Sequence, residues 1–232
     1  MKSSYKEYIN ALNKISTAIT SDLYLEDVLK LIVTLTANVM KAKICALWLL
    51  DPDAKELKIR ATQALSQEYL RERSIRLGEG IVGLVAKEKK AITILNVLED
   101  KRYKEKELAK KVNLVSTLSV PMMVKRKVIG VINCYTTSEH VFTKSEVDLL
   151  STVANQAAVA IENTELMVKT KIIQEELETR KKVERAKGIL MREQKLNEDE
   201  AYNLLRKSSM NKRVPMKEIA EAIILAYEIR ST

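Results

Sequence analysis

The chain has 232 residues, of which 46% are hydrophobic and 31% are charged, with a net charge of +9 at pH 7. This composition excludes a wholly disordered chain, and the length favours one medium domain followed by a smaller one. No uncharged apolar run is long enough for a membrane span and the N-terminal residues are charged, so we expect a cytoplasmic protein without a signal peptide and without a membrane partner.

The first two thirds of the chain predict an α+β fold. Apolar residues at spacings of three and four indicate two amphipathic helices within residues 5–42. At least five strands are expected, at residues 44–50, 57–62, 91–95, 118–124 and 128–135. Lys125, Arg126 and Lys127 form the polar loop of a hairpin between the last two. We expect an antiparallel sheet with helices covering one face.

Catalytic and metal sites are not indicated by the sequence. His140 is the only histidine, which excludes a histidine-based metal cluster, and none of the motifs HExxH, CxxC, GxSxG and GxxxxGK(S/T) is present. The segment 78–83 matches GxGxxG, but no buried parallel strand precedes it, so we reject a dinucleotide site. Cys45 and Cys134 lie in apolar runs without CxxC spacing, and we expect both to be buried. The protein is therefore not expected to be an enzyme.

The remainder of the chain predicts helices. From Lys144 the helical pattern continues without glycine or proline as far as Gly188, which indicates a helix of roughly 45 residues. A thin apolar seam over residues 166–183 favours a short coiled coil with a second chain. The linker assigned to this coiled coil covers residues 166–179.

Two further helices are expected after the long one. Asn197 and Glu200 have the spacing of a capping box, and Pro215 suits the first turn of a last helix. The last helix should present four apolar residues inward, at Ile219, Ala222, Ile223 and Ala226. With the end of the long helix they form a three-helix unit.

Five segments of the first two thirds resemble the GAF domain family in order: residues 77–83, 96–103, 119–121, 128–132 and 142–163. The resemblance covers about residues 10–165, and we assign a GAF-type sensor domain to residues 1–165. It implies a sensor with a pocket between the sheet and its covering loops. The pocket would take a small molecule or cofactor, which the resemblance does not identify. A GAF domain without ligand, serving only for dimerisation, is the alternative.

The C-terminal part resembles the ANTAR family through Val183 to Met191, Asn197 to Arg206 and Glu218 to Ala220. We assign an ANTAR-type three-helix RNA-binding domain to residues 180–232. The resemblance implies a homodimer that binds paired hairpins in nascent mRNA and so prevents a terminator from forming, which is transcription antitermination. A signal in the GAF pocket would then change how the long helices associate.

The candidate RNA-binding residues are mostly basic. Arg185 and Arg192 are seven residues apart and share a helix face, as do Arg180 and Lys187, while Tyr202 offers a ring for stacking on a base. The complete set is Arg180, Lys181, Arg185, Lys187, Arg192, Tyr202, Arg206 and Lys207. Core positions are expected at Ala186, Gly188, Ile189, Leu190, Ala201, Leu204 and Leu205.

Two other functions stay open from the sequence. A DNA-binding helix-turn-helix regulator would also place a basic helix on a dimer, although the apolar segment 223–227 suits a recognition helix poorly. A sensor or dimerisation module that binds no nucleic acid would attract RNA only weakly and without preference among sequences.

Overall fold

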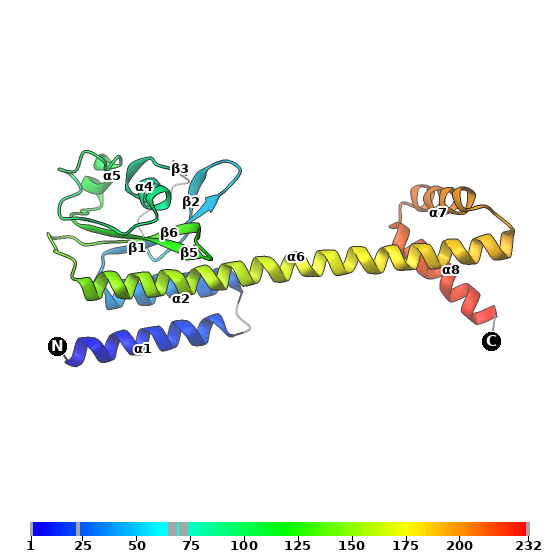
Figure 1. Cartoon of the computed structure of the whole chain (residues 1–232), viewed down its shortest axis with the longest axis horizontal. Coiled ribbons are helices and arrows are strands. Elements are labelled where there is room, and N and C mark those ends of the chain that lie inside the picture. The colour runs from blue at the N-terminus through cyan, green and yellow to red at the C-terminus, as the bar shows by residue number, and fades with distance from the viewer. Residues whose placement is uncertain (1, 22–23, 65–68, 70–73, 231–232) are drawn as a thin grey trace. The chain divides into compact units, whose positions relative to one another are not determined.

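The computed structural model describes residues 2–21, 24–64, 69 and 74–230 (Figure 1). The chain divides into two compact units, Met1–Thr164 and Glu165–Thr232. Helix α6 (Lys144–Gln194) begins in the first unit and ends in the second, and its 51 residues somewhat exceed the expected length.

The first unit contains a six-stranded antiparallel sheet with the strand order β3-β2-β1-β6-β5-β4. Its strands are β1 (Ile44–Asp51), β2 (Glu56–Thr62), β3 (Ser74–Arg76), β4 (Ile92–Ile94), β5 (Thr117–Val124) and β6 (Lys127–Tyr135). Five of them were expected, whereas β3 is an addition at the edge of the sheet. The hairpin between β5 and β6 turns at Lys125 and Arg126, both with positive φ, which suits the right-handed twist of the strands.

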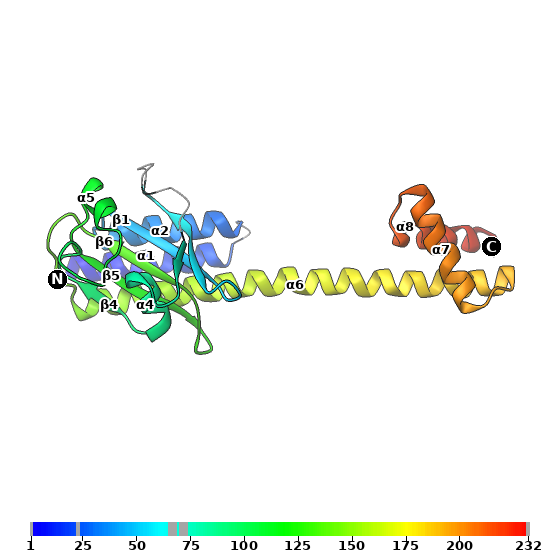
Figure 2. The same ribbon diagram turned by 90° about the horizontal axis from the view of Figure 1, so that it is seen from above.

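Helices lie on both faces of this sheet, as Figures 1 and 2 show. On one face lie α2 (Leu25–Val39) and the first part of α6, and α1 (Lys2–Ile19) packs on α2. On the other face lie α4 (Gly80–Glu88) and the short α5 (Lys106–Lys111). The expectation of helices on one face only was therefore incomplete.

The two faces of the sheet belong to two separate hydrophobic cores. On β1, Cys45 and Leu47 point to the core under α2 and α6, whereas Ala46 and Trp48 point to the core under α4. This alternation follows from the two-residue period of a strand, and it explains why β1 reads as a continuous apolar run. Cys134 of β6 lies opposite Cys45, and both cysteines are buried.

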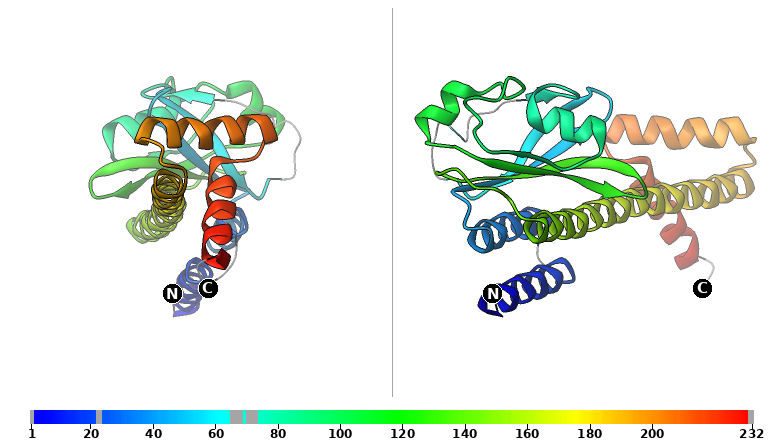
Figure 3. Two further views of the ribbon diagram at one scale, coloured as in Figure 1. Left: turned by 90° about the vertical axis from the view of Figure 1, so that its right-hand side faces the viewer. Right: turned by 60° about the vertical axis from the view of Figure 1, so that its left-hand side comes forward.

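The second unit consists of the C-terminal part of α6 with α7 (Glu198–Lys212) and α8 (Met216–Arg230), which both lie across α6 (Figure 3, left). The predicted capping box starts α7, because Asn197 Oδ1 accepts a hydrogen bond from Glu200 N and Glu200 Oε2 accepts one from Asn197 N, both at 2.9 Å. The core of the unit comprises eight buried residues: Val183, Ala186, Ile189, Leu190, Ala201, Leu205, Ala220 and Ile224.

The inward face of α8 differs from the expectation. Ala220 and Ile224 are buried, whereas Ala222 and Ala226 are exposed. Apolar residues surround most of α8, so periodicity alone does not identify one inward stripe. On α7, likewise, Leu205 is fully buried and Leu204 is not.

Candidate nucleic-acid interface and ligand cavity

Three exposed basic residues of α6 lie on one helix face, which borders α8. Lys181, Arg185 and Arg192 follow one another at spacings of four and seven residues, which places them along one side of a helix. We call these three residues the basic stripe. Their positively charged groups can meet phosphates at successive turns of the helix.

Two guanidinium groups of the basic stripe are positioned by neighbours. Arg185 Nη2 lies 2.7 Å from Glu228 Oε1, and both side chains are more than half exposed, so this pair contributes only about 0–1 kcal/mol. Phosphate can therefore replace Glu228 at low cost. Arg192 Nε donates a hydrogen bond to Gly188 O at 3.3 Å, and its guanidinium carbon lies 5.7 Å from the ring centroid of Tyr227, a cation–π contact.

Lys187 does not belong to the basic stripe. Its side chain is only 10% exposed, and its ammonium lies 2.7 Å from Glu198 Oε1 and 2.8 Å from Glu184 Oε2. The hydrogen bonds that the ammonium donates to Glu184 and Glu198 raise the pKa of Lys187, and the same ammonium lowers the pKa of Glu198. Lys187 thus ties α6 to the first turn of α7, and its ammonium is already engaged within the chain.

The other candidate residues lie on exposed surfaces of α6 and α7. Arg180 is exposed on α6, and Arg206 and Lys207 are exposed on α7. Tyr202 is 44% exposed and stands four residues before Arg206, so its ring and this guanidinium share one face of α7.

A groove between α6 and α8 was not foreseen from the sequence. It has a volume of about 320 Å³, and its charged rim includes Lys182 and Glu221, whose Nζ and Oε1 atoms are 2.5 Å apart. Its wall includes the apolar residues Ile224 and Leu225. The signal that could have revealed the rim is the seven-residue spacing of Glu221 and Glu228, which puts both acids on the α6 side of α8.

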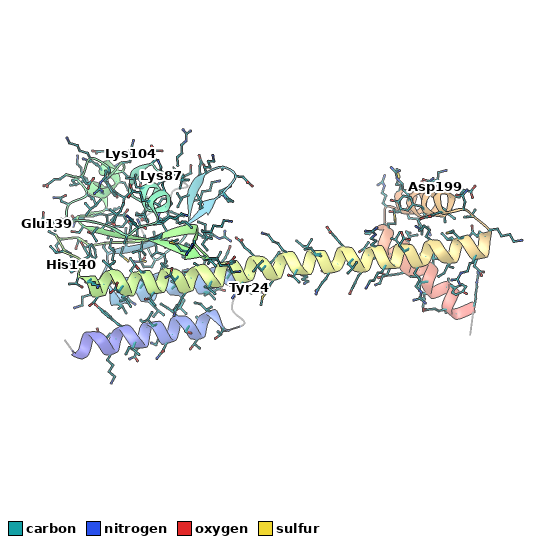
Figure 4. The ribbon with its side chains drawn as sticks, in the orientation of Figure 1. Tyr24, Lys87, Lys104, Glu139, His140 and Asp199 are labelled. Carbon is teal, nitrogen blue, oxygen red and sulfur yellow. The ribbon has the colours of Figure 1, made fainter. Side chains whose placement is uncertain are left out.

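The first unit contains a cavity of about 140 Å³ between β3, the start of α4, the segment 103–105 and the end of β6. Lys104 and Glu79 flank its polar side with Nζ and Oε1 3.6 Å apart, and Figure 4 shows Lys104 on the α4 side of the sheet. A group that enters this cavity meets one ammonium, carboxylates and tyrosine rings. It therefore suits a small polar ligand.

A buried hydrogen-bond network leads from the cavity into the sheet. The hydroxyls of Tyr103 and Tyr135, which line the cavity, are 3.5 Å apart, and Asn133 Nδ2 donates to Tyr135 Oη at 2.8 Å. Trp48 Nε1 donates to Asn133 Oδ1 at 3.1 Å. Burial, together with Tyr135, raises the pKa of Tyr103, so this phenol stays neutral. Trp48 is the only tryptophan of the chain and so offers a fluorescent reporter next to the cavity.

The glycines of the GxGxxG segment have structural roles. Gly78 and Gly80 have positive φ at the turn into α4, a conformation that glycine adopts readily. A Cβ atom at Gly83 would lie 2.3 Å from Arg76 O, so the third glycine permits α4 to pack on β3. Since β3 is an antiparallel edge strand, this geometry agrees with the rejection of a dinucleotide site.

Within the described residues 2–21, 24–64, 69 and 74–230, neither a metal-binding group nor a membrane-spanning helix is found. No group of three or more histidine, cysteine, aspartate or glutamate side chains is placed to hold a metal ion. Within the same ranges, no helix has the length and apolar character needed to cross a membrane.

Comparison with sequence families gives two matches along the chain. The family described as GAF domain matches residues 23–162, and the family described as ANTAR domain matches residues 172–224.

Curated relatives match each part separately. The phosphoenolpyruvate-dependent phosphotransferase system protein of Escherichia coli (strain K12) is 25% identical over 158 residues, which are 68% of this chain and 21% of that protein. The transcriptional regulatory protein PdtaR of Mycobacterium tuberculosis (strain ATCC 25618 / H37Rv) is 34% identical over 77 residues, which are 33% of this chain and 38% of PdtaR. The chain thus spans well under half of the length of either relative.

Solved structures resemble the first unit. The GAF domain of an Acinetobacter phosphoenolpyruvate-protein phosphotransferase has a TM-score of 0.61 and 26% identity, with 70% of this chain and 97% of that chain covered. The GAF domain of the corresponding protein from Coxiella burnetii has a TM-score of 0.65 and 22% identity, with coverages of 71% and 98%. The chain therefore belongs to the GAF domain family, and an ANTAR domain follows its GAF domain.

Proposed function

We propose that the chain is a signal-responsive transcription antitermination regulator that binds paired hairpins in nascent mRNA as a homodimer. The single observation that carries the proposal is the basic stripe, an exposed cationic helix face within the segment matched by the ANTAR family. The similarity to a transcriptional regulatory protein over 77 residues supports it. In this function the protein acts by binding and not by catalysis, and it works in the cytosol, where nascent mRNA is found.

For RNA contact we propose the exposed residues of the candidate set. The basic stripe neutralises phosphates, and Tyr202 stacks on an unpaired loop base beside Arg206. The exposed Arg180 and Lys207 extend the cationic surface. We give Lys187 a different role, that of a positioning residue, because two carboxylates already bind its ammonium.

For dimerisation we propose the segment 166–179 of α6. Leu166, Ile173 and Leu177 are each at least half exposed, and their spacings of seven and four residues form a narrow seam. Exposed apolar side chains at heptad spacing are covered when two such helices pair. Two copies then present two basic stripes, one for each hairpin of the RNA.

For the signal we propose a small polar ligand in the cavity of the GAF domain. The ligand would alter the Tyr135 network at the end of β6, which precedes α6 by only a short connection. Because α6 runs from Lys144 to Gln194 as one helix, a change at its start can shift the population of dimers whose ANTAR domains are competent to bind.

The experiment that tests the proposal compares three nucleic acids with the full chain: a paired-hairpin RNA, its single-hairpin half and a duplex DNA of matched length, over a salt series. A preference for the paired hairpin that persists at physiological salt is expected. Arg185→Ala should weaken this binding and lower the salt slope by about 0.7–0.9. The control is Arg126→Ala, which removes an exposed arginine from the β5–β6 hairpin and should change neither.

The outcomes separate the three functions. A preference for the DNA would favour a DNA-binding regulator and contradict the proposal. Equal binding to all three nucleic acids, lost with rising salt, would indicate only general attraction to a basic surface and favour the sensor module.

A further inference from the structure

Gly188 occupies an interior position of α6, where no contact within the described chain calls for a glycine. Glycine is less favourable than alanine inside a helix, because it loses more backbone entropy on folding. A Cβ atom built at Gly188 meets nothing within 4 Å, so no packing contact among the described residues requires its absence. Its φ is not in the left-handed region, which only Gly78 and Gly80 among the described glycines adopt. The described residues therefore give no steric reason for a glycine at this position.

The surroundings of Gly188 indicate which kind of partner approaches. Arg185 lies three residues before it and Arg192 four residues after it, so the bare main chain is framed by two guanidinium groups on one helix face. Arg192 Nε also donates to Gly188 O at 3.3 Å, which holds this guanidinium close to the glycine. The arrangement combines open backbone with positive charge on both sides.

We infer that Gly188 is the point of closest approach at which the sugar–phosphate backbone of the RNA rests against α6, between Arg185 and Arg192. This inference rests on the proposed function and adds a positioning residue that carries no charge. A methyl group at this position would hold the RNA away from the helix, and both guanidinium groups would then reach their phosphates less well. Every charge of the interface would nevertheless remain.

A second copy of the chain is the less suitable partner for this face. In a symmetric dimer the same surface meets itself, which would bring the arginines of one copy against those of the other. Like charges placed together across an interface are unfavourable, whereas an anionic backbone complements them.

The test is Gly188→Ala in the full chain. Alanine should stabilise α6 and raise the Tm of the second unit by roughly 4–8 °C, because it is the better helix former and meets no steric obstacle. At the same time the affinity for the paired-hairpin RNA should fall by roughly tenfold or more. The slope of log K against log salt should stay unchanged, since no charge has been removed.

Arg192→Ala is the matched comparison on the same stripe. It removes one cation and should lower the salt slope by about 0.7–0.9, which separates a lost charge from a lost close approach. A Gly188→Ala chain that binds the RNA as tightly as the wild type would overturn the inference. The inference would also be overturned if each dimer bound the RNA with unchanged affinity while self-association became weaker in sedimentation velocity. The glycine would then be needed for contact with a second copy of the chain.

The failure of this inference differs from the failure of the proposed function. If the wild-type chain prefers the paired hairpin and Gly188→Ala does too, with equal affinity, only the role of Gly188 is wrong. If the wild-type chain shows no such preference, the proposed function is wrong and the inference falls with it.

Discussion

Leu205→Ala should unfold the ANTAR domain selectively. Leu205 is fully buried in a core of only eight buried residues, and replacing a buried leucine by alanine costs about 2–5 kcal/mol. In a unit of roughly 70 residues, each kcal/mol lowers the Tm by about 4–8 °C. We therefore expect the Tm of the second unit to fall by roughly 8–40 °C.

The assay follows thermal unfolding with two probes on the same sample. Far-ultraviolet circular dichroism reports the helices of both units, whereas the fluorescence of Trp48 reports the sheet of the first unit alone. Leu205→Ala should move the helical transition of the second unit to lower temperature and leave the Trp48 transition in place. Leu204→Ala is the matched control, since the neighbouring leucine is 37% exposed and its truncation should cost about 1 kcal/mol or less.

Two results would refute this reasoning. If Leu205→Ala lowers the Trp48 transition as much as the helical one, the two units unfold as one cooperative block. If Leu204→Ala and Leu205→Ala have equal effects, the assignment of Leu205 to the core of the second unit is wrong.

Three further predictions concern the ion pairs of Lys187, the apolar seam in segment 166–179 and the start of α6. Lys187→Met should lower the Tm of the second unit, because Glu184 and Glu198 lose their shared partner, but it should leave the salt slope of RNA binding unchanged; a reduced slope would make Lys187 a phosphate contact. Ile173→Asp should dissociate the dimer in sedimentation velocity, whereas Val168→Asp, an exposed residue away from the seam, should not; equal effects would contradict the seam. Burial raises the pKa of Glu146, but hydrogen bonds from Thr143 and His140 outweigh it, so the pKa is lower than in the unfolded chain. The resulting stabilisation is complete above about pH 4.3, the ordinary pKa of glutamate, and is lost as the pH falls through the lower pKa of the folded state. Glu146→Gln should therefore reduce the loss of stability at acid pH in urea unfolding, and an unchanged loss would show that other carboxylates cause it.

Contacts between residues close in the sequence were predictable. The capping box at Asn197 needs only residues within one helical turn, and the turn at Lys125 and Arg126 joins strands that pair directly. Both features could be recognised because the local pattern contains every partner that the interaction needs. The resemblance to the GAF and ANTAR families also covered most of the chain.

Features that depend on distant partners were not predictable in the same way. Strand β3 has three residues, too few for an alternating pattern, and it forms only because β2 offers it an edge. Lys187 shares a helix side with Arg180, yet Glu198 comes from beyond the turn into α7 and covers its ammonium. The inward stripe of α8 likewise depends on where α6 and α7 leave room, because apolar residues lie on most of its sides.

The position of each basic residue around α6 decides how much of the charge is available to RNA. Lys187 turns toward α7 and is covered by two carboxylates, whereas the three cations of the basic stripe are exposed beside α8, so one copy offers RNA fewer accessible cations than the basic run contains. Two copies together offer six stripe cations, which predicts a salt slope of roughly 4–5 for binding of a dimer to the paired hairpin. A slope near half of this value would mean that one copy binds, and a clearly larger slope would add Arg180, Arg206 or Lys207 to the contact surface. The salt series therefore measures, in a single titration, both how many copies bind and how many of the candidate cations take part.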